Sequence, residues 1–177
     1  MRRIWPVLPA ALFLLLAGVS AAHAERRVAL VIGNSAYQHT GLLANPKNDA
    51  ADVTAALKRH GFEVTEGYDL DKAAMDRIIR RFADQMRGAP VAVFFYAGHG
   101  LQLRDRNYLI PTDAEIRGED EIPIAGLDLG FILGRMSSAR SRVNIVILDA
   151  CRNNPFAGRS GARAQGLAQM DAPVGTL

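Results

Sequence analysis

The residues of this chain best suited to chemistry are Cys151, its only cysteine, and His99. Each follows an apolar run that is typical of a strand buried on both faces: 143–148 (VNIVIL) precedes Cys151, and 91–96 (VAVFFY) precedes His99. In an open parallel sheet, chemistry takes place beyond the carboxyl ends of the strands. Two neighbouring strands would therefore bring a thiol and an imidazole to one edge, as catalysis by a thiolate nucleophile requires.

This pair could support acyl transfer. At neutral pH only a few per cent of an ordinary thiol is ionised. His99 could take the proton of Cys151 and later deliver it to a leaving amine. The backbone N–H groups of Gly100 and Cys151 are candidates to donate hydrogen bonds to an oxyanion.

A structural interpretation stands beside the catalytic one. A lone cysteine is often a small buried hydrophobic residue, and a histidine at a strand end can be a satisfied core residue. The equivalent positions of His99 and Cys151, each after a buried strand, favour catalysis over these alternatives.

Other cofactor chemistry finds little support. Residues 33–35 follow the first predicted strand without a glycine-rich phosphate fingerprint, which makes a nucleotide-binding domain the weaker alternative. His, Cys and acidic residues show no zinc spacing. We therefore expect no cofactor. Calcium dependence stays open, because the acidic residues of one loop match no recognisable ligand spacing: Glu115, Glu119, Asp120 and Glu121.

The elements that must position the pair alternate along the chain. Strands are predicted at 27–32, 62–68, 91–96 and 143–148. Helices are predicted at about 50–60, 72–87 and 127–138. A hairpin is expected over 101–110. Such alternation predicts an α/β fold with a mostly parallel sheet and right-handed crossovers.

The predicted helices have candidate caps. Asn48 or Asp49 could cap the first helix, and Asp69 or Asp71 the second. Beyond residue 156 the apolar pattern stops. We expect a flexible loop from 157 onward and the start of an incomplete strand at 172–177.

Residues 1–24 have the features of a secretory signal peptide. Two arginines are followed by an apolar run over 7–19 and a small-x-small cleavage site at 22–24. The run is short for a membrane span, and an uncleaved N-terminal anchor is the alternative. We expect residues 25–177 to form one exported domain, periplasmic or secreted from a bacterial cell.

The charge balance does not favour nucleic acid or an acidic membrane. The chain has 21 basic and 18 acidic residues, and two of the basic ones lie in the leader, which leaves 19 against 18. The sequence pI of 9.3 is therefore no sign of a basic binding surface. We expect protein or peptide partners, no nucleic acid and no membrane after leader cleavage, and we leave the oligomeric state open.

The residues around the pair resemble a known family. Ala150-Cys151-Arg152 resembles the caspase signature Q-A-C-[RQG]-G, and His99 stands 52 positions upstream, as that signature expects. Asp149 replaces the Gln and Asn153 the Gly. Further motifs are ALVIGNSAY at 29–37, YAGHG at 96–100, NDA at 48–50 and NYLIP at 107–111. Together they resemble bacterial caspase-family peptidases of the metacaspase-like or orthocaspase group, clan CD, over residues 26–177.

The resemblance implies roles and a fold. His99 and Cys151 match the catalytic dyad, and Asp149 and Asp49 match acids that line the pocket for the substrate side chain before the scissile bond. Two carboxylates in one pocket select a cation, so cleavage after Arg or Lys is expected. The implied fold is a three-layer sandwich with helices on both faces of the sheet. Its sheet would continue beyond Leu177, so we expect the C-terminal part to be truncated.

Departures from the pattern keep one alternative open. Metacaspases often have Ser two positions before the histidine, where this chain has Ala97. Many of them need calcium. The alternative to a cysteine endopeptidase is a catalytically weak or inactive caspase-like interaction module.

Overall fold

The computed structural model describes residues 25–151, together with Leu167 and Thr176. The strands of this part of the chain form one sheet: β1 (Arg27–Gly33), β2 (Phe62–Tyr68), β3 (Val91–Leu103), β4 (Arg106–Leu109), β5 (Leu127–Asp128) and β6 (Val143–Cys151). Its helices are α1 (Pro46–Arg59), α2 (Lys72–Gln85), α3 (Ile122–Ala125) and α4 (Leu129–Ser138), with a 3₁₀ turn, η2 (Glu119–Glu121), before α3. The predicted leader, 1–24, lies outside the described residues.

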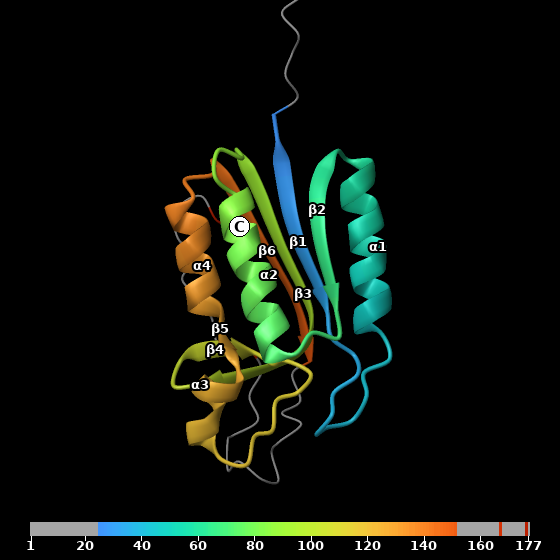
Figure 1. The fold of residues 1–177 in the computed structure, drawn as a ribbon, viewed down its shortest axis with the longest axis vertical. Coiled ribbons are helices and arrows are strands. Elements are labelled where there is room, and N and C mark those ends of the chain that lie inside the picture. The colour runs from blue at the N-terminus through green and yellow to red at the C-terminus, as the bar shows by residue number, and fades with distance from the viewer. Residues whose placement is uncertain (1–24, 152–166, 168–175, 177) are drawn as a thin grey trace, which may run out of the picture.

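The sheet is mixed. β2, β1, β3 and β6 are neighbours and run parallel, whereas β4 pairs antiparallel with the last part of β3, and β5 pairs antiparallel with β4 (Figure 1). The antiparallel pair β3–β4 is the predicted hairpin. This topology confirms the predicted α/β fold.

Helices cover both faces of the sheet, which makes three layers. On one face, α2 and α4 pack Ile79, Phe82 and Met136 against Phe94 and Tyr96 of β3. These side chains are at most 2% exposed. Burial of such large apolar side chains stabilises a fold by about 1.5–3 kcal/mol each, so this layer is the main core.

On the other face, α1 packs against the middle of the sheet. Ala50, Val53 and Leu57 of α1 meet Val31 of β1 and Phe95 of β3. Odd-numbered residues of β3 therefore face α1, and even-numbered ones face α2 and α4, since alternate strand residues point to opposite faces.

Strands β3 and β6 extend further than predicted. The expected ends at Tyr96 and Leu148 are wrong, because β3 runs to Leu103 and β6 to Cys151. The glycines after Tyr96 do not stop β3, because its ladder with β6 continues and β4 then pairs with it from Gly100 onward. His99 therefore lies inside a strand.

The prediction that 143–148 is buried on both faces is also wrong. Ile147 is 44% exposed and Val143 36%, whereas Asn144 is buried. The helix α1 packs over β1, β2 and β3, so the α1 face of β6 lacks a covering helix among the described residues. Of the predicted strand at 172–177, only Thr176 is described, and it forms a parallel bridge with Asn144.

The observed first residues of the helices differ in part from the capping prediction. α1 begins at Pro46 after Asn45, so Asn48 and Asp49 lie in its first turn and neither is the cap. Proline at the first helical position loses no hydrogen bond, which explains the earlier start. For α2 the cap is Asp71, whose side chain accepts a hydrogen bond from the Ala74 amide. The helix predicted at 127–138 is α4, and it begins at Leu129, since Leu127 and Asp128 form β5.

Candidate active site

The two candidate reactive residues are partners across adjacent strands. Strands β3 and β6 are neighbours, and their parallel register pairs Ala97 with Asp149 and His99 with Cys151. Neighbouring strands are about 4.8 Å apart, so the backbones at positions 99 and 151 are side by side. The pairing brings both residues to one edge of the sheet, as expected from the two apolar runs. It is the central geometric fact of the candidate site.

The imidazole of His99 lies in a confined environment. The residue is 5% exposed, and neither ring nitrogen makes a hydrogen bond to the described part of the chain. Burial lowers the pKa of His99 below its usual 6.5, and the nearby Gly41 backbone offsets this only in part. The lowered pKa favours the neutral imidazole at neutral pH, which is the form that can accept a proton.

Two tyrosines hold the backbone of His99. Its amide donates to Tyr37 Oη at 2.7 Å, and its carbonyl accepts from Tyr96 Oη at 2.8 Å. The two hydroxyl oxygens are 3.3 Å apart. The ring of Tyr37 also lies 4.4 Å from the imidazole, centroid to centroid. Sequence analysis included Tyr37 and Tyr96 in motifs but gave neither a role.

Gly100 presents its amide toward β6. The His99 carbonyl accepts from the Ile110 amide on the β4 side of β3. Backbone groups of successive strand residues point to opposite sides, so the Gly100 N–H is directed to the side of Cys151. A Cβ at position 100 would lie 3.0 Å from Leu167 and 3.1 Å from Ala150, so the close packing favours glycine there.

The two predicted pocket acids reach the same end of the molecule. Asp149 is exposed and two positions before Cys151, on the α1 face of the sheet by register. Asp49 is half-buried in the first turn of α1, whose Pro46 and Ala50 contact the end of β1 at Gly33. Within the described residues neither carboxylate has a salt bridge. Two acidic side chains therefore lie at the end of the sheet that holds His99.

The loop that carries Tyr37 is fixed by residues the sequence analysis did not assign to the site. Asn34 is fully buried, and its side chain donates to the Ile110 carbonyl and accepts from the Leu70 amide. Asp69, which was a candidate cap of α2, instead accepts hydrogen bonds from the Ser35 and Ala36 amides. The signal that the sequence offered for this role in fixing the loop was the polar pair Asn34-Ser35, directly after the first buried strand.

Asp69→Asn is expected to destabilise the protein at neutral pH and much less in acid. Burial alone would raise the Asp69 pKa, but hydrogen bonds from Lys47, Ala36 and Ser35 outweigh it and lower the pKa below 3.8. A lowered folded pKa contributes stability above the unfolded pKa, and this is lost as pH falls through the folded value. Asparagine tolerates the positive φ of 50° at this position.

Urea unfolding of wild-type and Asp69→Asn protein from pH 7 to pH 3 measures this difference. The gap in unfolding free energy should be widest at pH 7 and narrow below about pH 4. Asp84→Asn, which removes an exposed partner of Arg87, should change stability little. A gap for Asp69→Asn that does not depend on pH would contradict the prediction.

Neither a metal site nor a membrane span is found within the part of the chain that the structure describes. Among the described residues, no three or more His, Cys, Asp or Glu side chains are grouped to hold a metal ion. In the candidate calcium loop, one oxygen of Glu115 accepts from the Arg117 guanidinium and one oxygen of Glu121 accepts from the Arg117 amide. None of the helices in the described part of the chain is long and apolar enough to cross a membrane.

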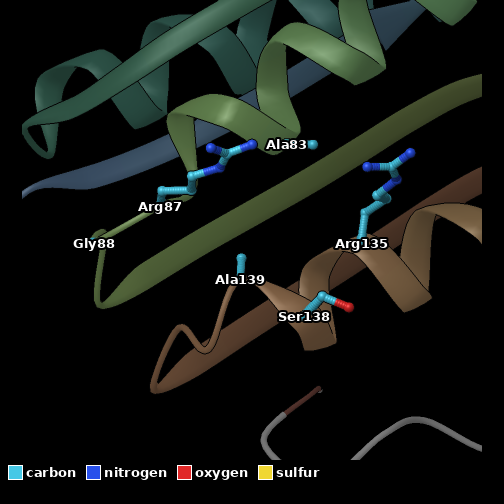
Figure 2. A pocket seen from close by; sticks show the side chains of 6 residues that line it. All are labelled: Ala83, Arg87, Gly88, Arg135, Ser138 and Ala139. Carbon is cyan, nitrogen blue, oxygen red and sulfur yellow. The ribbon is translucent and has the colours of Figure 1, made fainter.

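A separate hollow of about 270 Å³ lies between α2 and α4. Figure 2 shows Arg87 and Arg135 on either side of Ala83, with Ser138 and Ala139 below. It is at the far end of the sheet from His99, since its residues come just before β3 and β6. Both arginines lie at helix C-termini, where a cation is favoured, which explains them without a ligand.

Comparison with known proteins shows which sequences this chain is similar to. The family model described as the caspase domain matches residues 26–174. The human mucosa-associated lymphoid tissue lymphoma translocation protein 1 is 28% identical over 131 residues, which are 73% of this chain and 15% of that protein. A probable protease of a Desulfuromonadales bacterium is 31% identical over 94 residues, 51% of this chain and 11% of that protein. The chain thus spans a small part of the length of these relatives.

Proposed function

The chain belongs to the caspase-domain family of peptidases, and from this premise we propose that it is a cysteine endopeptidase that cuts proteins after Arg or Lys. The observation that carries the proposal is the backbone pairing of His99 with Cys151. The predicted membership of the caspase family is confirmed. Three further statements go beyond this membership and are our inferences: the catalytic dyad, the preference for basic residues, and the compartment in which the protein acts.

The proposed reaction is acyl transfer through a thioester. The neutral imidazole of His99 removes the thiol proton of Cys151, and the thiolate attacks the substrate carbonyl carbon. The oxyanion that forms would accept from the Gly100 and Cys151 amides, which the end of the β3–β6 ladder must release for this step. His99 then gives its proton to the leaving amine. Water, deprotonated by His99, hydrolyses the thioester and frees the new carboxylate.

The proposed specificity follows from charge. Asp149 and Asp49 present two carboxylates at the end of the sheet that holds His99. A substrate cation would be attracted there, and a substrate carboxylate would be repelled and poorly solvated. Arginine also binds a carboxylate with two parallel hydrogen bonds, which favours it among the cations.

The predicted leader indicates the compartment in which the proposed activity would take place. We assign residues 1–24 to an export signal and place the mature domain in the periplasm or outside the cell. Its substrates there would be proteins or peptides with accessible basic residues. A single cysteine suits such a compartment, because it has no second thiol in its own chain to pair with.

Two peptides that differ only in Arg or Asp before the cut test the proposal. We expect the full chain to hydrolyse the Arg peptide at least about tenfold faster, because the carboxylates favour the cation. The measurement is the initial rate of product release by chromatography, with a Cys151→Ala preparation as the control for contaminating proteases. Preferential hydrolysis of the Asp peptide would contradict the specificity.

A further inference from the structure

We propose that Tyr37 is the positioning residue of the catalytic histidine: it fixes His99 for proton transfer through a hydroxyl contact with its backbone and a ring contact with its imidazole. The inference rests on the proposed function and deepens it. It assigns a role to the last residue of the ALVIGNSAY stretch, which neither the dyad nor the acid pocket explains.

The hydrogen bonds around His99 run through two tyrosine hydroxyls, and Tyr96 Oη also lies 3.1 Å from the Ile110 carbonyl. Its N–H donates to Tyr37 Oη at 2.7 Å, Tyr37 Oη and Tyr96 Oη are 3.3 Å apart, and Tyr96 Oη donates back to the His99 carbonyl at 2.8 Å. Each tyrosine hydroxyl has one proton to donate. In one arrangement, the His99 N–H donates to Tyr37 Oη, Tyr37 Oη donates to Tyr96 Oη, and Tyr96 Oη donates to the His99 carbonyl. Hydrogen bonds in such a chain polarise and strengthen one another.

The end of β1 explains why the hydroxyl is needed. β1 pairs with β3 only as far as Gly33 and Ala97, and the Asn34 amide then donates to the Ala97 carbonyl. His99 lies two residues beyond Ala97 on β3, where β1 has ended, so no carbonyl of β1 can accept from its amide. An unpaired buried N–H is costly, and Tyr37 Oη supplies the acceptor that the missing strand would have provided.

Gly98 leaves the space that this arrangement requires. A Cβ at position 98 would lie 2.6 Å from Tyr37 Oη and 2.7 Å from Tyr96 Oη, closer than real Cβ contacts. Its φ of +155° also suits glycine. The residue before His99 is therefore small so that both hydroxyls can reach the strand backbone.

The imidazole itself is positioned by packing. Neither ring nitrogen makes a well-formed hydrogen bond to the described part of the chain, and the Gly41 backbone is the polar group that acts on the imidazole there. The Tyr37 ring contacts it at 4.4 Å with an interplanar angle of 48°. In many nucleophile–base pairs a third group orients the base. Here Tyr37 fills that place through the backbone and the ring face.

Tyr37→Phe is the direct test, because it keeps the ring and removes the hydroxyl. The readout is the rate at which iodoacetamide alkylates Cys151, followed by mass spectrometry from pH 5 to pH 9. This rate reports the thiolate, needs no peptide, and depends on an imidazole in place to take the proton. We expect about a tenfold lower rate at pH 7 and a pH profile shifted upward. For the Arg peptide, kcat should fall with KM little changed.

Three further variants make the result decisive. Tyr68→Phe removes a tyrosine hydroxyl that bonds Glu66 on β2, a strand that β1 separates from β3, and should alkylate like the wild type. Tyr96→Phe opens the same chain at its other hydroxyl and should shift the profile in the same direction, so it replaces Tyr37→Phe if that protein does not fold. His99→Ala sets the rate expected when no base is present.

These variants separate two failures. If His99→Ala alkylates as fast as the wild type, the dyad itself is wrong. If His99→Ala is slow while folded Tyr37→Phe and Tyr96→Phe both match the wild type in rate and pH profile, the dyad stands and the positioning role is overturned. Circular dichroism confirms that each variant is folded before alkylation is measured.

Discussion

Cys151→Ala is expected to lower kcat/KM for an Arg-containing peptide by about 10³-fold or more, because no other cysteine of the chain can replace the nucleophile. His99→Ala should cause a loss of similar size, since the thiol would then lack its base. Residues that act as one unit are not additive, so the double variant should be no slower than the worse single variant. Initial rates with the purified full chain, at matched concentration, measure all three.

The matched control for this pair is His60→Ala. His60 is an exposed histidine that follows α1, outside the β3–β6 pair, and its loss should leave the rate unchanged. Unfolding curves of the variants distinguish lost chemistry from lost structure. Substantial activity in folded Cys151→Ala would rule out the thiol as nucleophile. Equal activity of His99→Ala and His60→Ala would remove the histidine from the mechanism.

The two strands behind this prediction could be recognised from sequence because their signal is local. The runs at 91–96 and 143–148 are apolar and β-branched or aromatic, and such runs form the interior of parallel sheets. Adjacent placement follows once helices alternate with strands. The residues at which these strands end were harder to predict. Gly98 and Gly100 suggest a turn, but β4 and β6 supply hydrogen-bond partners that keep β3 extended.

The support of His99 could not be derived in the same way. Tyr37 is 62 positions from the His99 amide that it accepts from, and 59 from the Tyr96 hydroxyl beside it. Nothing in the pattern around residue 37 indicates which distant backbone group it will meet. Asp69 is similar: its carboxylate holds the Ser35 amide across 34 positions, while its local context indicates a helix cap. Contacts of this kind depend on the completed sheet.

Asp149→Asn is expected to lower kcat/KM for an Arg peptide by about 10–100-fold, mainly through a higher KM, because it removes one of two charges that attract the substrate cation. Asparagine keeps the shape of the side chain at this strand position, so the pairing of Ala97 with residue 149 should persist. Asp49→Asn should act in the same direction. Michaelis–Menten kinetics with Arg and Gln peptides of otherwise identical sequence measure the effect.

The Gln peptide separates charge from structure. If Asp149 acts as a charge, its replacement weakens Arg hydrolysis selectively and leaves the slow Gln reaction nearly unchanged, so the Arg-to-Gln preference falls. Asp105→Asn is the matched control, because Asp105 is an exposed carboxylate in the β3–β4 hairpin at a φ of 61°, which Asn also tolerates. An equal loss on both peptides would mean that Asp149 supports the strand next to Cys151 rather than the substrate. Basic specificity would then have to come from another group.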